Sequence, residues 1–286
     1  MHAFVFANQP VRGAMGNMTA KTSIGERRSW SIASGASPVI GTAIHDGHGT
    51  REDVTGLMAL SDVQRLREED PFTAQMIAGL VNRLVVHHSR FEVDLNRAKE
   101  AAIYLEPEQA WGLKVWKESP SDDTISRSLQ FHEDYYSTLE HVLKQIEQRH
   151  SAFVLLDVHS YNHRRDGADA MPTPQDRAPD INIGTISMDR DRWADVIEAT
   201  INHFSTARIG GRHLDVRENV AFQGKGEQTR FVHERFPENG CAIAIEFKKI
   251  FMDEWTGKPD EQMIDDIQEA VTSLEPVLEK LLDGRR

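Results

Sequence analysis

The sequence is short of cysteine and has no long apolar run. Cys241 is the single cysteine among 286 residues, so the chain can form neither an intrachain disulfide nor a zinc site made of several thiolates. Any metal ion must therefore be held by His, Asp or Glu. No apolar stretch approaches the roughly 18 residues of a membrane span, and the N-terminus lacks the basic and then apolar order of a secretory signal. We expect a soluble, cytoplasmic protein without a membrane partner.

Positive charge is also in the minority. The chain has 33 basic and 45 acidic residues and a formal net charge of -12, which argues against nucleic acid or an anionic membrane surface as a partner. The length suffices for one large α/β domain or two small ones. We expect residues 1–36, which are rich in small residues and have no clear period, to be a poorly ordered leader. Residues 37–286 then form a single α/β domain.

The most informative stretch is FVLLDVHSY, residues 153–161. Its first half is apolar apart from Asp157, which is typical of a strand buried on both faces. His159 stands where this strand ends, and ligands of open α/β sheets bind beyond the carboxyl ends of the strands. Asp157 lies on the same face of the pleat, within reach to hold the His159 ring in one tautomer, as carboxylates do for metal-ligating histidines. The alternative is a histidine that merely caps a loop.

Two further apolar segments, residues 38–44 and 241–247, also bring a histidine or an acid to a predicted strand. The first leads into His45 and the Gly-rich turn HDGHGT, and the second contains one acid, Glu246, whose burial is costly unless the carboxylate is paired, metal-linked or near a cavity. Two histidines and one carboxylate are a common ligand set of catalytic zinc, and a further carboxylate would take the proton of a water. Asp70, in EEDP, is the best candidate ligand, with Glu246 as the base. An ordinary acidic helix start is the alternative for Asp70.

Segments of helical period alternate with the predicted strands, which predicts an α/β sandwich. A helix is expected after Asp70, where apolar residues recur up to Leu84. Three longer helices are expected at residues 122–148, 189–204 and 260–282, and a short strand at residues 180–185. The polar segment 162–179 has the length of a lid or rim loop, and we expect residues 219–237 to be irregular and to form part of a pocket wall.

One basic segment stands out in this acidic chain. Arg90, Asn96 and Arg97 lie within eight positions of one another, and guanidinium groups suit the capture of a carboxylate. A network of structural salt bridges is the alternative interpretation.

The chain resembles the N-formylglutamate amidohydrolases, because five short motifs occur in the order seen in that family. The motifs are His45-Asp46-Gly47, Arg90 followed by Val93-Asp94-Leu95-Asn96-Arg97, Asp157-Val158-His159-Ser160, Asp180-Ile181-Asn182-Ile183-Gly184-Thr185, and Ile245-Glu246 followed by Phe251-Met252-Asp253-Glu254. The resemblance runs from about residue 38 to the C-terminus. It implies a three-layer α/β sandwich with a mostly parallel or mixed central sheet, similar to zinc carboxypeptidases and to the aspartoacylase group.

The resemblance also implies a zinc-dependent hydrolase of amino-acid metabolism, acting in histidine degradation, that cleaves N-formyl-L-glutamate into formate and L-glutamate. His45 and His159 match the family's metal ligands. The acidic ligand between them falls on Asp70, although Pro71 replaces the family's tryptophan after it. His48 is the competitor of Asp70, because His45-x-x-His48 copies the His-x-x-Glu spacing of carboxypeptidases.

The remaining roles carry over in the same way. Glu246 would be the general base, Arg90 would polarise the scissile carbonyl, and Asn96 with Arg97 would hold the substrate carboxylate. The family's Phe-Lys-Gly-Gly-Tyr segment reads Phe222-Gln223-Gly224-Lys225-Gly226 here, which leaves the acyl group and the amino acid open. Alternatives are a zinc carboxypeptidase or another N-acyl amino acid deacylase and, from a different class, a non-catalytic binder of metal or carboxylate. The sequence does not indicate an oligomeric state.

Overall fold

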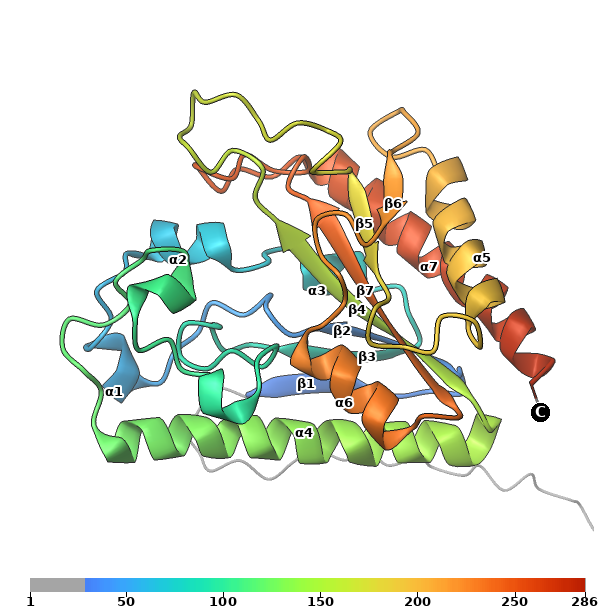
Figure 1. Ribbon diagram of the computed structural model, residues 1–286, viewed down its shortest axis with the longest axis horizontal. Coiled ribbons are helices and arrows are strands. Elements are labelled where there is room, and N and C mark those ends of the chain that lie inside the picture. The colour runs from blue at the N-terminus through green and yellow to red at the C-terminus, as the bar shows by residue number, and fades with distance from the viewer. Residues whose placement is uncertain (1–28, 286) are drawn as a thin grey trace, which may run out of the picture.

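The computed structural model describes residues 29–285. A seven-stranded sheet in the order β1-β3-β2-β4-β7-β5-β6 forms its centre (Figure 1). The pairs β2–β3, β2–β4, β4–β7 and β5–β6 are parallel, and β1–β3 and β5–β7 are antiparallel. The strands are β1 (Trp30–Ala33), β2 (Val39–Ala43), β3 (Asn82–Val86), β4 (Phe153–Tyr161), β5 (Ile181–Gly184), β6 (Val216–Glu218) and β7 (Gly240–Lys248).

Helices cover both faces of this sheet. Figure 1 shows α4 and α6 along one side of the sheet and α5 and α7 along another. The α-helices are α1 (Glu52–Thr55), α2 (Asp62–Glu68), α3 (Thr73–Met76), α4 (Asp122–His150), α5 (Ala194–Thr206), α6 (Glu227–Arg235) and α7 (Glu261–Asp283), and the 3-10 helices are η1 (Lys99–Ala101) and η2 (Pro107–Ala110). The predicted three-layer α/β fold with a mixed sheet is confirmed. No helix within residues 29–285 is long and apolar enough to cross a membrane.

Strand β4 divides the core in two because its side chains alternate between the faces of the sheet. Val154 and Leu156 belong to the apolar cluster under α5 and α7, whereas Phe153 and Leu155 belong to the cluster under α4 and α6. All nine residues of the strand are buried, as its apolar sequence predicts. The alternation continues at the strand's carboxyl end, so Asp157 and His159 face the α4 and α6 side.

Three segments differ from the sequence prediction. Residues 1–28 of the predicted leader lie outside the described residues, but Trp30–Ala33, which the prediction included in that leader, pairs with β3 as an edge strand. The helix predicted after Asp70 is only the short α3, because the chain turns and enters β3, which contains Leu84. The segment 219–237 contains α6, whose buried face includes the polar Gln228 and Thr229 and therefore gives no apolar stripe. The division into a leader and one domain stays a prediction.

Candidate metal centre

The site is built where the carboxyl ends of β2 and β4 lie next to each other. The register pairs Thr42 of β2 with Asp157 of β4, so His45, three residues past Thr42, and His159, two residues past Asp157, emerge at the same edge of the sheet. Asp70 comes from the turn after α2, and its backbone N–H donates to the carbonyl oxygen of His45 at 2.9 Å. This bond ties the two loops together.

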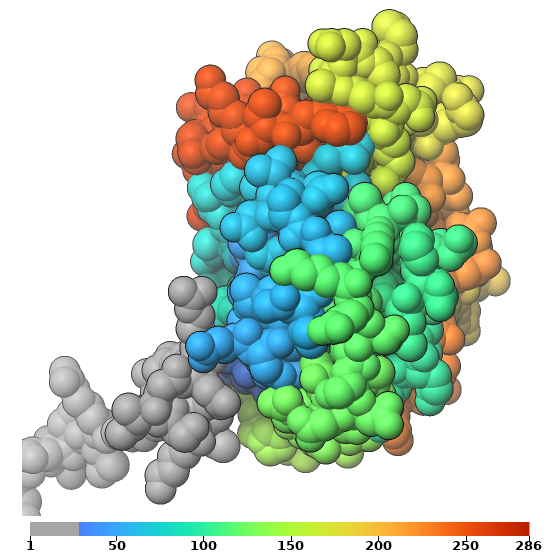
Figure 2. Space-filling view, turned by 90° about the vertical axis from the view of Figure 1, so that its left-hand side faces the viewer, coloured from blue at the N-terminus to red at the C-terminus, as the bar shows by residue number. Residues whose placement is uncertain are grey.

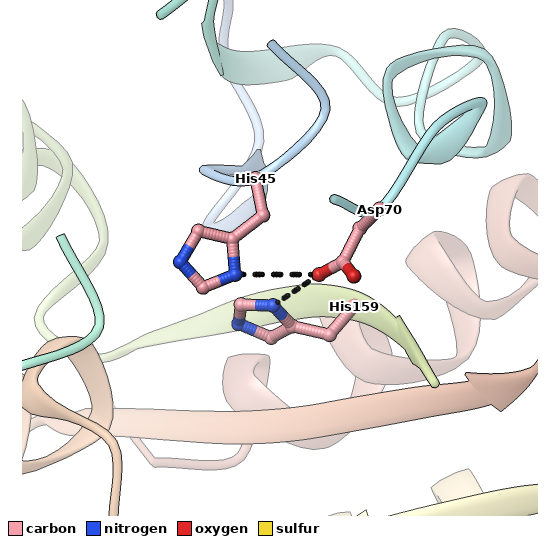
Figure 3. A group of neighbouring side chains, drawn as sticks. All are labelled: His45, Asp70 and His159. Atoms are coloured by element: carbon pink, nitrogen blue, oxygen red, sulfur yellow. Dashed lines mark hydrogen bonds and ion pairs between the residues drawn. The ribbon is translucent and has the colours of Figure 1, made fainter. Parts of the chain in front are cut away.

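Two histidine side chains converge on one carboxylate oxygen of Asp70 (Figure 3). Nδ1 of His159 lies 2.9 Å and Nδ1 of His45 lies 3.3 Å from Oδ2 of Asp70. Potential ligand atoms of these three residues all lie within 4.8 Å of one another, and each residue is at most 2% exposed. Among the described residues, they form the group of His, Cys, Asp and Glu side chains that could hold a metal ion.

The electrostatics of this cluster suit a cation. Burial by itself would raise the pKa of the Asp70 carboxyl, but the hydrogen bond with His159 and charge attraction from both His159 and His45 hold it well below its ordinary value. Burial would lower the pKa of His159, yet Asp157, Asp70 and Glu246 raise it well above its ordinary value. Nδ1 of His45 is buried without a hydrogen-bond partner. The cluster therefore offers two imidazole nitrogens and one carboxylate oxygen, and one of the two nitrogens has no hydrogen-bond partner. This donor set fits zinc or a similar divalent ion.

The outer nitrogen of each histidine contacts a second carboxylate. Nε2 of His159 lies 2.9 Å from Oδ1 of Asp157, which is the contact that the sequence predicts. Nε2 of His45 lies 2.7 Å from Oδ1 of Asp94, a contact that the sequence analysis missed. Both carboxylates are buried. Carboxylates in this position orient a metal-ligating imidazole and make it more basic, and they leave both Nδ1 atoms to face Asp70.

Asp94 also connects the metal centre to the basic segment. Its Oδ2 accepts a hydrogen bond from Nη2 of Arg90 at 2.8 Å, and its Oδ1 accepts one from the backbone N–H of Asn96 at 2.8 Å. Nε of Arg97 lies 3.6 Å from Oδ2, and Nδ2 of Asn96 lies 3.4 Å from Nε2 of His159. The three residues predicted to contact substrate therefore lie together beside the histidines.

Glu246 lies beside His159 because the two are register partners on the parallel strands β7 and β4. Its side chain is largely buried. Burial raises the pKa of Glu246 to about 8, with Asp70 and Asp157 adding to the rise, whereas His159 and Arg90 act in the opposite direction. A neighbouring cation would favour the ionised carboxylate.

The structure places His48 outside this cluster. Its Nδ1 contacts Oε2 of Glu69 at 2.5 Å, its Nε2 contacts Nη2 of Arg65 at 3.1 Å, and the side chain is 38% exposed. Ser160, expected to support the site by hydrogen bonding, donates from Oγ to Oδ1 of Asp70 at 3.4 Å. Of the two candidates for the middle ligand, Asp70 is therefore the one that lies between His45 and His159.

Asn182 connects the segment predicted as a pocket wall, residues 219–237, to the strand that carries Glu246. Asn182 is the register partner of Glu246, and its side-chain oxygen accepts the backbone N–H groups of Val220 and Ala221 at 2.9 and 2.8 Å. Further along this segment, a Cβ atom on Gly226 would lie 2.0 Å from Oδ1 of Asn96. The missing side chain at Gly226 thus lets the segment pack directly against Asn96.

Known proteins share this fold and sequence pattern. The model of the N-formylglutamate amidohydrolase family matches residues 37–252. An N-formylglutamate amidohydrolase crystal structure from Ralstonia eutropha aligns with a TM-score of 0.70 at 16% identity, covering 90% of this chain and 99% of that chain. A gene product from Agrobacterium tumefaciens aligns with a TM-score of 0.59 at 14% identity, covering 90% and 93%. No curated protein sequence matched the chain. At these identities the two crystal structures support the fold.

Proposed function

Because the chain belongs to the N-formylglutamate amidohydrolase family, we propose that it hydrolyses the amide bond of a small N-acyl amino acid at the cluster of His45, Asp70 and His159. N-formyl-L-glutamate is the first candidate substrate, with formate and L-glutamate as products. The observation that supports this most directly is the convergence of both Nδ1 atoms on one oxygen of Asp70, with Glu246 beside His159.

His45, Asp70 and His159 would hold one divalent metal ion, which we propose is zinc. When bound, such an ion supplies Lewis-acid chemistry, because it acidifies water and polarises a carbonyl group. The buried contacts to Asp94 and Asp157 hold both imidazole rings in the tautomer whose Nδ1 is free to bind it. Both rings therefore already have the orientation that metal binding requires, and need not reorient when the ion binds.

Glu246 would act as the general base. Its carboxylate takes a proton from the attacking water, whose oxygen bonds to the acyl carbon, and then delivers that proton to the nitrogen of the amino acid as the C–N bond breaks. A buried carboxyl group whose pKa is raised to about 8 holds its proton well enough for the second step. Beside a bound cation, Glu246 would favour its ionised form, which is the form that accepts a proton in the first step.

Arg90 would face the carbonyl oxygen of the scissile amide. Its side chain is only 13% exposed and is held by Asp94 and by the carbonyl oxygen of Glu68 at 3.4 Å, so its charge is fixed before substrate arrives. A preorganised donor of this kind stabilises the negative charge that develops on the oxygen. Asn96 and Arg97 would hold the substrate carboxylate, since the Arg97 side chain is 34% exposed at the rim.

A small substrate panel tests this proposal. N-formyl-glutamate, N-acetyl-aspartate, N-succinyl-glutamate and a dipeptide are incubated with the protein as purified, after chelation, and after zinc is restored. Chelator-sensitive release of formate from N-formyl-glutamate is the expected result. Turnover of another compound would keep the site and change the substrate, and turnover of the dipeptide would favour a carboxypeptidase. A protein that binds zinc stoichiometrically but hydrolyses none of the four would favour a non-catalytic binder.

A further inference from the structure

An exposed tryptophan near the metal centre lies beneath two arginines that come from different loops. The guanidinium carbon of Arg90 lies 4.9 Å from the ring centroid of Trp111, and that of Arg165 lies 5.6 Å from the same centroid. Trp111 is 43% exposed and has a φ of 54°, a left-handed conformation that residues other than glycine rarely adopt. Backbone outliers of this kind concentrate at ligand sites.

A third arginine belongs to the same group. Arg97 lies over the ring of Tyr104, with 4.7 Å between the guanidinium carbon and the centroid, and the centroids of Tyr104 and Trp111 are 6.1 Å apart. Neighbouring rings therefore hold Arg97 and Arg165. A chain with a formal net charge of -12 thus gathers positive charge at one point of its surface.

The carboxylates near this group compensate the positive charge only in part. Asp94 is shared by Arg90 and Arg97, and it also contacts His45. Glu68 pairs with Arg165 and with another arginine of α2. Within residues 29–285, the Arg165 side chain has a hydrogen bond through Nη1, so its other N–H groups can still form the paired contact with a carboxylate that guanidinium groups favour.

The backbone beside Arg165 is held firmly although it begins a long loop. The N–H groups of His163 and Arg164 each donate to the Glu254 carboxylate at 2.8 Å, and Nε1 of Trp255 donates to the carbonyl oxygen of Arg164 at 3.0 Å. Figure 2 shows the yellow-green segment after residue 160 beside the orange-red segment around residue 255, with the blue segment that contains α2 below them. These hydrogen bonds therefore fix the backbone from which the Arg165 side chain extends.

We propose that Arg165 binds a second carboxylate of the substrate and makes the site selective for acyl derivatives of dicarboxylic amino acids. This inference rests on the proposed function. The carboxylate next to the amide would be held by Asn96 and Arg97, and a side-chain carboxylate a short carbon chain away would meet Arg165 over the adjacent ring. A neutral side chain of the same length would lose that contact.

The test compares N-formyl-L-glutamate with N-formyl-L-glutamine in the zinc-loaded enzyme. Arg165→Met should raise KM for the glutamate derivative by about 10- to 100-fold, the effect of losing a charge-assisted pair. The kcat for the glutamate derivative, and both kcat and KM for the glutamine derivative, should change by no more than about twofold. Arg165→Lys should restore part of the loss. Arg164→Met is the matched control, because it removes an arginine from the adjacent position, whose side chain contacts the carbonyl oxygen of Ala168, and it should change neither substrate.

Several results would overturn the inference. An unchanged KM for the glutamate derivative in Arg165→Met, or an equal loss for both substrates, would show that Arg165 does not recognise the side chain. Calorimetric titration of L-glutamate and L-glutamine gives a readout without turnover, and equal affinities in the unmodified protein would contradict the selectivity. If the unmodified enzyme hydrolyses neither derivative, the proposed function itself fails. If the unmodified enzyme hydrolyses both derivatives and Arg165→Met has the same kinetic constants as the control Arg164→Met, the proposed function stands and this inference fails.

Discussion

His159 and Glu246 stand opposite each other on the parallel strands β4 and β7, one with its Nδ1 on the Asp70 carboxylate and the other buried with its pKa raised to about 8. Side chains opposite each other in a sheet point to the same face. A residue that can bind a metal ion and a residue that can move a proton are thereby fixed side by side on neighbouring inner strands of the sheet.

Replacement of Glu246 by Gln should separate catalysis from metal binding. The amide cannot accept a proton, so kcat should fall by about 10²- to 10⁴-fold, the usual contribution of a general base. Zinc content should stay near one ion per chain, because Glu246 is not in the ligand cluster. Elemental analysis and a formate assay on the same sample check both points. A Glu246→Gln protein with the normal rate would refute this mechanism.

Asp70 and His48 can be distinguished by metal affinity. Asp70→Asn replaces the oxygen on which both histidines converge, and we expect zinc affinity to fall by at least about 100-fold, beyond the range typical of a supporting carboxylate. His48→Ala removes an imidazole that contacts Glu69 and Arg65 and should leave the affinity within about threefold. Competition with a fluorescent chelator measures both values. The reverse order would identify His48 as the ligand.

The two outer carboxylates should give different kinetic effects. Asp157→Asn and Asp94→Asn should each weaken zinc binding by about 10- to 100-fold, because each supports one histidine. With zinc at saturation, Asp157→Asn should have a normal KM. Asp94→Asn should also raise KM, since Asp94 holds Arg90 and the backbone of Asn96. KM values that agree between the two variants would show that Asp94 does not organise the substrate-binding residues.

Folding stability should decrease in mild acid because of His233. Nε2 of His233 accepts the backbone N–H of Ala242 at 2.9 Å, which requires a neutral ring, and burial lowers the pKa of His233 from 6.5 to about 4. The unfolded chain therefore binds this proton first as the pH falls. The contribution is fully present above about pH 6.5 and is lost between pH 6.5 and 4, in total about 3 kcal/mol.

Urea unfolding of the protein and of His233→Gln at pH 7 and pH 4.5 checks this prediction. The difference in unfolding free energy between the two proteins should shrink as the pH falls, because the variant has no group to titrate at this position. Parallel pH dependence in both proteins would show that the acid sensitivity comes from other groups.

Sequence reasoning identified the parts of the site that lie on strands. The apolar run that begins at Phe153 predicted β4, although the strand continues to Tyr161, past the end predicted near His159. The period of two placed Asp157 on the same face as His159, where the contact is found. The single acid in the apolar segment 241–247 indicated Glu246 in the same way. These inferences needed only the local alternation of a strand, which does not depend on the rest of the molecule.

Sequence reasoning missed or left open the parts that lie on turns and loops. Asp94 contacts His45 across 49 positions, and no local pattern connects them. The edge strand β1 and the helix α6 were not predicted, because β1 is partly exposed and α6 buries polar residues. Arg165 lies in a segment for which the sequence indicated only a polar loop, and its position follows from hydrogen bonds that join the backbone of the preceding residue, Arg164, to Glu254 and Trp255 on a distant turn.

By itself, the sequence determined the α/β class, the strands near whose carboxyl ends His45 and His159 lie, and, from the lone cysteine, the exclusion of a metal site made of several thiolates. The tertiary structure decided which acid lies between the two histidines, because the path of a turn depends on what packs around it. Asp70 is directed inward by the bond from its N–H to the carbonyl oxygen of His45, whereas His48 is held away by Glu69 and Arg65. Period fixes the faces of strands and helices, but only packing between distant segments fixes the direction of a loop.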